Sequence, residues 1–326
     1  MKITSCLIVL APLFLVNSCD NVKSAPQGAR TPQEKVEIQN FITKVKSEMI
    51  FVHGGKFWMG DFCSKSRNTT ADCTSDEDNK PLHEVELASY SISKFKFTHE
   101  YYDFYLKIKN LPEQKFKSKS IDDIFVQMIH FKNSPAIVTW TEADNFCTWL
   151  KIETGLPFSL PTEAQWEYAA RNRGQYLLLG TDDGTWRINK KTELGENIPS
   201  EEDRRKVEED DGVMSSLVHF PVDKYPANGL GLYDMAANGF EWAKDWYDPN
   251  YYKNSPSKDP QGPDNPVVKD NQTGQYLKSL RSINFSTSGI PEGLTFSRSR
   301  KIKDADYPAG TTARCVINSA TPIRNQ

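Results

Sequence analysis

Turn-forming residues interrupt the second half of the chain so often that no long helix or strand fits there. After residue 174 the sequence runs through "GTDDGTW", "ENIPSEEDRRKVEEDDG", "YPANGLG" and "YDPNYYKNSPSKDPQGPDNP". Glycine, proline, asparagine and aspartate favour turns because they adopt or fix backbone angles that regular elements exclude. Together with an aromatic content of 11%, this pattern predicts a loop-rich globular domain rather than a helical bundle or a disordered chain.

The charges are balanced and spread along the chain. There are 40 basic and 43 acidic residues, for a formal net charge of -3, which gives no reason to expect a nucleic-acid partner. No repeat period is visible. We therefore expect a single domain over residues 47–326, which is long enough to bury a sizeable core.

The N-terminal stretch "MKITSCLIVLAPLFLVNSC" has one lysine followed by an apolar run that is too short to span a bilayer. This pattern indicates a secretory signal over residues 1–18. The segment "LVNSC" resembles the bacterial lipobox, which predicts that Cys19 is lipidated and becomes the mature N-terminus. The alternative is ordinary signal cleavage that leaves Cys19 unmodified.

The residues after Cys19 indicate where the chain is held. Asp20 and Asn21 resemble the signal that retains lipoproteins at the inner membrane. Residues 19–46 are polar at first and then amphipathic, as in a tether that leads into a short helix. We therefore expect a soluble body in the periplasm, held by its lipid anchor to the inner membrane, with the outer membrane as the alternative.

The N-terminal part of the domain shows patterns of strands. "MIFVHGGKFWMGD" alternates apolar residues around Gly54 and Gly55, which predicts a hairpin. "PLHEVELASYSISKFKFTHEYYDFYLKI" predicts two strands that enter a helix. Between them, Cys63 and Cys73 flank a polar loop and are expected to form a local disulfide in an oxidising compartment.

Two helices are predicted next. "IVTWTEADNFCTWLKIETG" has the apolar spacing of a helix, with Thr141 and Asp144 as a capping pair and Gly155 at its end. "LPTEAQWEYAARNRG" predicts a second helix with Pro161 in its first turn and Gly174 beyond its end.

The order of these segments resembles the formylglycine-generating enzyme, or sulfatase-modifying factor, family. The resemblance covers nearly the whole body of the chain, and "FPVDKYPANGLGLYDMAANGFEWAKDWYD" is its most diagnostic segment. It implies a compact, loop-rich α+β domain that is related to C-type lectins. It also implies a structural disulfide between Cys147 in "NFCTWL" and Cys315 in "TARCV".

Calcium is the cofactor that the residues and the resemblance both suggest. Calcium takes carboxylate and carbonyl oxygens from tightly curved loops, and "DMAANGFE" offers both kinds. The first predicted site uses the side chains of Asp234 and Glu241 with the carbonyls of Ala237 and Gly239. The second matches another family site, with the side chains of Asn197 and Asp211 and the carbonyls of Ile198 and Val213. We expect both ions to be structural, because bound calcium can hold loops in one arrangement.

The chemistry of the family's oxidase members is not supported by the cysteines of this chain. Those members use a nearby pair of C-terminal cysteines that bind copper(I) as thiolates. The corresponding segment here, "LRSINFSTSGIPEGLTFSRSRKIKD", contains no cysteine. The resemblance therefore implies a member without catalytic residues, and no copper is expected.

Our hypothesis for function is a non-catalytic, calcium-stabilised periplasmic lipoprotein that binds a protein partner. It would act as an immunity protein against a toxin delivered by type VI secretion, or as an accessory factor that binds the outer domain of a membrane receptor. The contact surface is expected on the altered face, which is formed by "INFSTSGIPEGLTF", where the catalytic groups of the family are replaced, together with loops such as "KNLPEQKFKSKS". Phe285 and Phe296 are its expected aromatic anchors. The alternatives are an oxidase that acts on a sulfatase cysteine and a carbohydrate-binding protein.

Overall fold

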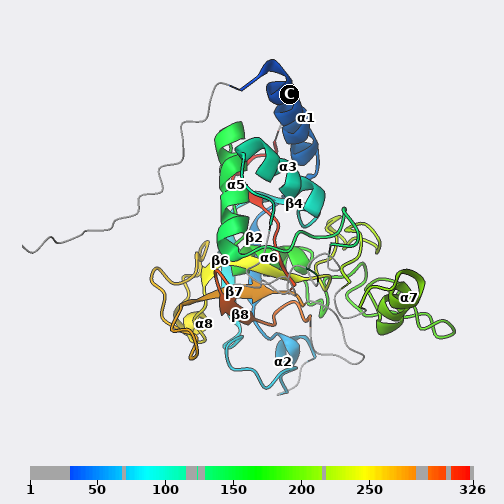
Figure 1. The fold of residues 1–326 in the computed structure, drawn as a ribbon. Coiled ribbons are helices and arrows are strands. Elements are labelled where there is room, and N and C mark those ends of the chain that lie inside the picture. The colour runs from blue at the N-terminus through cyan, green and yellow to red at the C-terminus, as the bar shows by residue number, and fades with distance from the viewer. Residues whose placement is uncertain are drawn as a thin grey trace, which may run out of the picture.

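The computed structural model describes most of the chain beyond residue 29. The described ranges are 30–67, 71–114, 123, 129–214, 218–283, 293–305 and 310–323. Short helices and strands follow one another, joined by long irregular stretches (Figure 1). The predicted loop-rich α+β class is therefore confirmed. Among the described residues, no helix combines the length and the apolar character needed to cross a bilayer.

The described strands form three small sheets. The first has the order β1 (Met49–Val52), β4 (Tyr90–Ser93), β10 (Val316–Ile317) and β5 (Phe158–Ser159). The second pairs β2 (Gly55–Met59) with β3 (His83–Leu87). The third has the order β8 (Ser299–Ile302), β7 (Leu277–Arg281), β6 (Phe240–Trp246) and β9 (Thr311–Thr312). Because β10 lies between β4 and β5, the C-terminal segment closes a sheet that the N-terminal segment begins.

Three helices gather at one end of the molecule, at the top of Figure 1. They are α1 (Pro32–Ser47), α3 (His99–Lys109) and α5 (Trp140–Thr154). The other described helices are α2 (Cys63–Ser66), α6 (Glu163–Ala170), α7 (Glu201–Asp211) and α8 (Tyr251–Asn254). The largest apolar core lies beneath α1, α3 and α5 and includes Trp242 of β6.

Helix α1 lies where the amphipathic end of residues 19–46 predicts a short helix, and it packs against the domain. Its apolar residues Ile38, Ile42 and Val45 recur at helical spacing and are buried in the main core. The ring of Phe41 stacks on Phe104 of α3 with centroids 4.4 Å apart. The predicted short helix is therefore packed on the core, and residues 19–29, where the tether is expected, lie outside the described residues.

The hairpin predicted around Gly54 and Gly55 is wrong. β1 pairs with β4, whereas β2 pairs with β3, so the two strands belong to different sheets. Gly54 serves a close approach instead of a hairpin turn, because a Cβ there would lie 2.2 Å from the carbonyl oxygen of Leu87. The two strands and the helix predicted in the following segment are confirmed as β3, β4 and α3.

The helices α5 and α6 are where the sequence predicts them, but they begin at other caps. The N-cap of α5 is Thr139, which forms a capping box with Glu142, and Gly155 ends the helix in the left-handed conformation as predicted. The N-cap of α6 is Thr162, paired with Gln165. Each threonine oxygen accepts a backbone N–H that the first helical turn leaves unpaired, and each partner side chain accepts the N–H of the cap.

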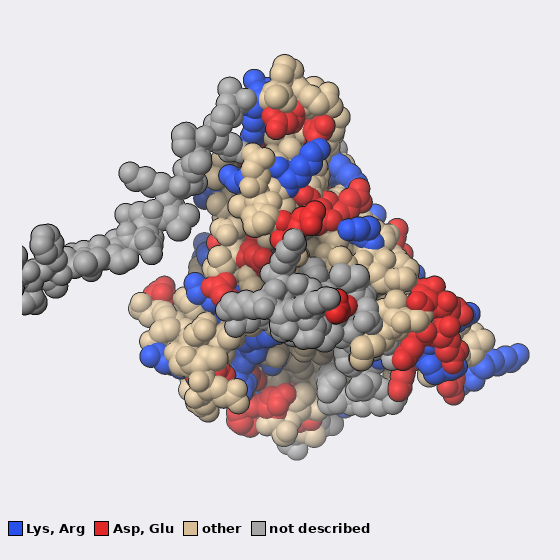
Figure 2. Space-filling model, viewed as in Figure 1, with Lys and Arg blue, Asp and Glu red and all other residues tan. Residues whose placement is uncertain are grey.

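The charged stretch "EEDRRKVEEDD" forms helix α7, although the sequence suggested a loop. Ser200 and Asp203 make a capping box at its start, and Gly212 ends it with φ of 70°. Arg205 pairs with Glu202 and Glu209, one turn away on either side. Acidic side chains consequently gather over α7, at the right of Figure 2.

Candidate functional site

The turn that leads into β6 is built from unusual backbone angles. Asp234, Asn238 and Gly239 have φ values of 57°, 64° and 107°. Aspartate and asparagine are among the few residues that adopt the left-handed region, and only glycine adopts 107° without strain; a Cβ on Gly239 would also lie 2.5 Å from Thr312. These conformations turn three consecutive carbonyls, those of Ala237, Asn238 and Gly239, towards one point.

Lys96 occupies that point. Its Nζ donates hydrogen bonds of 2.7, 3.1 and 2.6 Å to the carbonyl oxygens of residues 237, 238 and 239. The side chain is 0% exposed, so all three ammonium hydrogens have an acceptor inside the protein. Burial lowers the pKa of Lys96 to about 8, and the carboxylates of Glu241 and Asp234 oppose this shift.

Two carboxylates and one guanidinium complete the cluster. Arg314 donates to both oxygens of Glu241, at 2.6 and 2.9 Å, and to the carbonyl of Tyr233 at 2.8 Å. Asp234 accepts a hydrogen bond of 2.9 Å from the side chain of Asn238. Burial raises the pKa of Asp234 to about 7, and the positive charge of Lys96 opposes this shift by favouring the ionised carboxylate. With Lys96, the cluster has two cationic and two acidic side chains.

These residues do not fit the calcium ion predicted at this turn. The structure brings the four predicted ligand residues together, and the carbonyls of Ala237 and Gly239 point inward as expected. They surround an ammonium group, however, and both oxygens of Glu241 already accept from Arg314. A calcium ion needs six to eight oxygens within about 2.6 Å, so it could bind only after Lys96 had left.

The sequence reading missed Lys96 because it lies 141 residues before the carbonyl of Ala237 in the chain. The sequence did contain a weak signal. In "SISKFKF", Lys96 stands between Phe95 and Phe97, shortly after a strand, and a charged side chain that is buried between apolar neighbours needs a partner.

The second predicted calcium set consists of Asn197, Ile198, Asp211 and Val213. The amide of Asn197 is buried, accepts the N–H of Arg187 at 2.9 Å and donates to Asp182 at 2.9 Å. Asp211 lies at the end of α7 and pairs with His130 at 3.0 Å. The side chain of Asn197 thus contacts Arg187 and Asp182, whereas that of Asp211 contacts His130, so the two share none of these partners. Calcium at this place stays a prediction.

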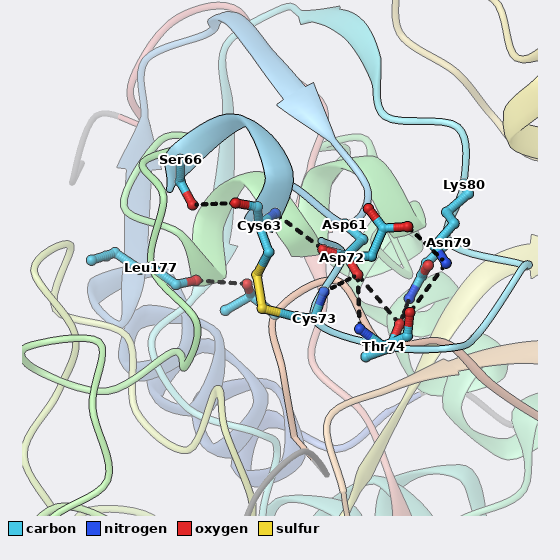
Figure 3. The surroundings of a disulfide bond; sticks show 10 residues. Asp61, Cys63, Ser66, Asp72, Cys73, Thr74, Asn79, Lys80 and Leu177 are labelled. Atoms are coloured by element: carbon cyan, nitrogen blue, oxygen red, sulfur yellow. Dashed lines mark hydrogen bonds and ion pairs between the residues drawn. A yellow bond between two sulfur atoms is a disulfide. The ribbon is translucent and has the colours of Figure 1, made fainter. Parts of the chain in front are cut away.

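Both predicted disulfides are present. Cys63 and Cys73 close the polar loop around α2, as Figure 3 shows. Asp61 fixes this loop, because its carboxylate accepts the backbone N–H groups of Cys63, Cys73 and Thr74 at 3.1, 2.9 and 3.0 Å. Asp61 and the two sulfurs lie close enough together to suggest a metal site, but sulfurs joined in a disulfide offer no thiolate.

The second disulfide, between Cys147 and Cys315, joins α5 to the segment before β10. Four of the six cysteines are thus oxidised, and the other two, Cys6 and Cys19, precede the described residues. No cysteine remains between residues 20 and 326 that could contribute to a thiolate pair. The donor set does not fit copper(I).

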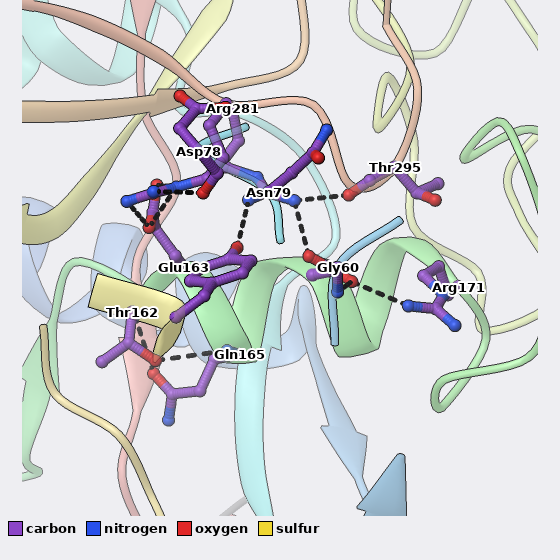
Figure 4. A network of polar contacts seen from close by, with 12 residues as sticks. Gly60, Asp78, Asn79, Thr162, Glu163, Gln165, Arg171, Arg281 and Thr295 are labelled. Carbon is purple, nitrogen blue, oxygen red and sulfur yellow. Dashed lines mark hydrogen bonds and ion pairs between the residues drawn. The ribbon is translucent and has the colours of Figure 1, made fainter. Parts of the chain in front are cut away.

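A buried network of charges holds the two ends of the altered segment (Figure 4). Arg281, which precedes residues 284–292, donates to Glu167 at 2.9 Å and to the carbonyl of Thr295 at 2.5 Å. Glu167 also accepts from Arg171 at 2.7 Å and from the N–H of Gly60 at 2.9 Å. The side chains of this network have no exposed surface, so Arg281 is structural here.

Glu163 and Arg298 form a second part of the network. Their side chains are 1% and 0% exposed and pair at 2.9 Å. Arg298 also donates to the backbone carbonyl of Asp78 at 2.7 Å. Since Glu163 and Glu167 are both paired with guanidinium groups, neither is free to act as a general base.

Of the two aromatic residues predicted to anchor a partner, the structure describes only Phe296. Phe296 is 0% exposed, and its ring packs edge-on against Phe62 with centroids 5.1 Å apart. We therefore correct its assignment: it is a core residue and cannot anchor a partner at the surface. Phe285 lies outside the described residues.

Comparison with known families decides the relationship of the chain. Residues 31–291 match the family described as "Sulfatase-modifying factor enzyme 1-like domain". The chain belongs to this family. The resemblance stated from the sequence is confirmed, and the match of the sulfatase-modifying factor domain begins at α1, in agreement with the packing of that helix.

Relatives of this sulfatase-modifying factor domain include enzymes of known name. The chain is 35% identical to the formylglycine-generating enzyme of Streptomyces coelicolor over 199 residues, which are 56% of each chain. It is 28% identical to the serine/threonine-protein kinase pkn1 of Chlamydia caviae over 262 residues, 76% of this chain and 35% of the kinase. The chain thus spans about half, or less, of these relatives.

Two solved structures share the fold of this chain. PvdO from Pseudomonas aeruginosa superimposes with a TM-score of 0.55 at 20% identity, over 82% of this chain and 93% of its own. Treponema denticola variable protein 1 gives a TM-score of 0.51 at 18% identity, over 83% and 95%. At such identities the likeness concerns the fold alone.

Proposed function

We propose that this sulfatase-modifying factor domain is a non-catalytic member of its family and acts by binding another protein. The observation that carries the proposal is the state of its cysteines. Both disulfides together use every cysteine from residue 20 onwards, so the thiol pair that the family resemblance implies for oxidase chemistry is missing. The scaffold is retained through the disulfides and the buried charge network, while the reactive groups are absent.

The proposed location follows from the N-terminal sequence. A lipid on Cys19 would hold the domain at the periplasmic face of the inner membrane, with the outer membrane as the alternative. An inhibitor tethered there would meet a toxin where the toxin arrives. We therefore place an immunity protein against a type VI secreted toxin slightly ahead of an accessory factor for the outer domain of a receptor.

The proposed contact surface is the altered face around residues 284–292. With Phe296 in the core, Phe285 is the aromatic anchor that remains from the two predicted. A tight complex buries a standard interface of about 1,600 Å², in which truncation of one central aromatic residue can cost more than about 2 kcal/mol of binding energy.

Co-expression with the secreted toxin encoded beside this gene, or with the neighbouring receptor's outer domain, tests the proposal. The full-length wild type should co-purify with that protein and, for a toxin, protect the cells. Phe285→Ala should weaken both effects without lowering the melting temperature. As a matched control, Phe296→Ala should lower the melting temperature, because it empties a core position. Protection that persists without physical association would contradict inhibition by binding.

The alternative is an oxidase that acts on a sulfatase cysteine. Its support is the 35% identity to the Streptomyces coelicolor formylglycine-generating enzyme, over 56% of each chain. A titratable thiol pair in the folded, unreduced protein would favour it over the binding proposal.

A further inference from the structure

We propose that Lys96 supplies the cation of the 234–241 turn from within the chain, so that its ammonium group stands where the family resemblance predicts a calcium ion. The turn would then need no calcium. The proposal concerns the fold of the domain and is independent of its partner.

All four predicted calcium-ligand residues act on this one ammonium group. The carbonyls of Ala237 and Gly239 accept its hydrogen bonds at 2.7 and 2.6 Å. The Oε1 atom of Glu241 lies 3.8 Å from Nζ, within ion-pair distance, and the carboxylate of Asp234 favours the charged lysine. A cation already occupies the position towards which the predicted ligands point.

The charges of the cluster leave no place for a further ion. Lys96 and Arg314 balance Asp234 and Glu241, and Lys96, Arg314 and Glu241 have no exposed surface. A calcium ion would add two positive charges to a buried, neutral cluster. Buried charge without a counter-ion is strongly unfavourable, so the ion could enter only if the ammonium left.

The surrounding backbone prevents Lys96 from leaving easily. The side chain of Asn238 exchanges two hydrogen bonds of 2.9 Å with the backbone of Phe220, which fixes the middle of the turn. Gly239 packs against Thr312 too closely to admit a Cβ. Release of the ammonium would therefore require the turn to open.

Substitution of Lys96 provides the first test. Lys96→Ala leaves three buried carbonyls without their donor and should lower the melting temperature of the full chain by about 5–10 °C. It also vacates the cation position, so millimolar calcium should restore about half of that loss by mass action. Calcium is the probe and magnesium is the comparison. The longer bonds of calcium to oxygen suit the vacated site better than those of magnesium.

Lys278→Ala is the matched control. This lysine is also buried, but it donates to one carbonyl, that of Lys244 at 2.8 Å, and lies over the rings of Trp140 and Trp246. Its loss should lower the melting temperature, and calcium should raise that temperature no more than it does in the wild type. An equal calcium response in the two variants, or none in Lys96→Ala, would overturn the proposal.

A second arm uses proteins that retain Lys96, in case Lys96→Ala does not fold. The wild type and Asp234→Asn are melted in calcium and in chelator. We expect any calcium response to be the same in both, because this turn holds no ion. A response that is present in the wild type and lost in Asp234→Asn would place calcium at the turn and refute the role of Lys96.

Discussion

The carboxylate of Glu241 accepts hydrogen bonds of 2.6 and 2.9 Å from the guanidinium of Arg314, and neither side chain has any exposed surface. The pair joins the start of β6 to the residue two positions before β10. β6 and β10 are inner strands of different sheets, so the ion pair links the two four-stranded sheets. Loss of one partner would leave the other charge buried without a counter-ion.

Glu241→Gln should therefore lower the free energy of unfolding by about 3–5 kcal/mol, measured by urea denaturation. Glu84→Gln is the control. Glu84 pairs with Lys56 at 2.9 Å on the surface, where ion pairs contribute little, and its loss should leave stability nearly unchanged. Similar losses for the two variants would contradict the structural role of the buried pair.

The two disulfides should contribute unequally. Cys147 and Cys315 are 168 residues apart, whereas Cys63 and Cys73 are 10 apart. In the chain-entropy account, the larger loop constrains the unfolded chain more, by about 5 kcal/mol against about 3 kcal/mol. We expect the Cys147→Ala, Cys315→Ala double variant to have the lower urea midpoint of the two. The reverse order would show that native-state effects outweigh loop closure.

Phe296→Ala should destabilise the domain by about 3–5 kcal/mol, because the ring is fully buried against Phe62. Phe296→Leu, which keeps most of the volume, should cost much less. Thermal or urea unfolding measures both. If Phe296→Ala is as stable as the wild type, the ring is not in the core, and its assignment as a surface anchor regains support.

The burial of His99 leads us to expect that the domain loses stability in weak acid. Burial lowers the pKa of His99 to about 3 from its ordinary value of 6.5. The folded state therefore keeps the imidazole neutral, while the unfolded state binds a proton below pH 6.5. Stability should consequently fall as the pH drops from about 6.5 towards 4, by up to about 1.4 kcal/mol per pH unit from this group.

The variant His99→Gln tests this pH dependence. Its unfolding free energy should vary less between pH 6.5 and 4 than that of the wild type. His53→Gln, which alters an exposed histidine, should leave the wild-type slope in place. A slope that is unchanged in His99→Gln would show that other groups carry the acid sensitivity.

Much of the fold could be predicted from local sequence patterns and from the family resemblance. The helices α5 and α6 are visible from apolar spacing. The N-cap of α5 is Thr139 rather than Thr141 because both threonines stand at its start, and Pro161 precedes the N-cap of α6 instead of lying in its first turn. The Cys63–Cys73 disulfide is suggested by the short loop between the two cysteines, whereas the Cys147–Cys315 disulfide was implied by the family resemblance. Helix α7 was missed because its charges resemble a solvated loop, although Ser200 and Gly212 mark its ends.

What the sequence does not reveal depends on contacts between distant segments. The hairpin around Gly54 fails because β1 and β2 find partners in different sheets, which local alternation does not specify. Phe296 follows the mostly small and polar residues "STSGIPEGLT", a pattern typical of an exposed loop, yet its ring packs against Phe62. The same holds for Lys96, whose role depends on carbonyls 141 to 143 residues further along the chain.

The most direct test of the non-catalytic account is an assay for conversion of a sulfatase-motif cysteine. The full-length protein is incubated with a peptide that carries the motif, with copper(I), oxygen and a thiol reductant, and the peptide is analysed by mass spectrometry. The Streptomyces coelicolor formylglycine-generating enzyme is the positive control. We predict that the control converts the cysteine to formylglycine and that this protein leaves it unchanged. Conversion above the copper-only background would contradict the account, since Cys63, Cys73, Cys147 and Cys315 are all held in disulfides.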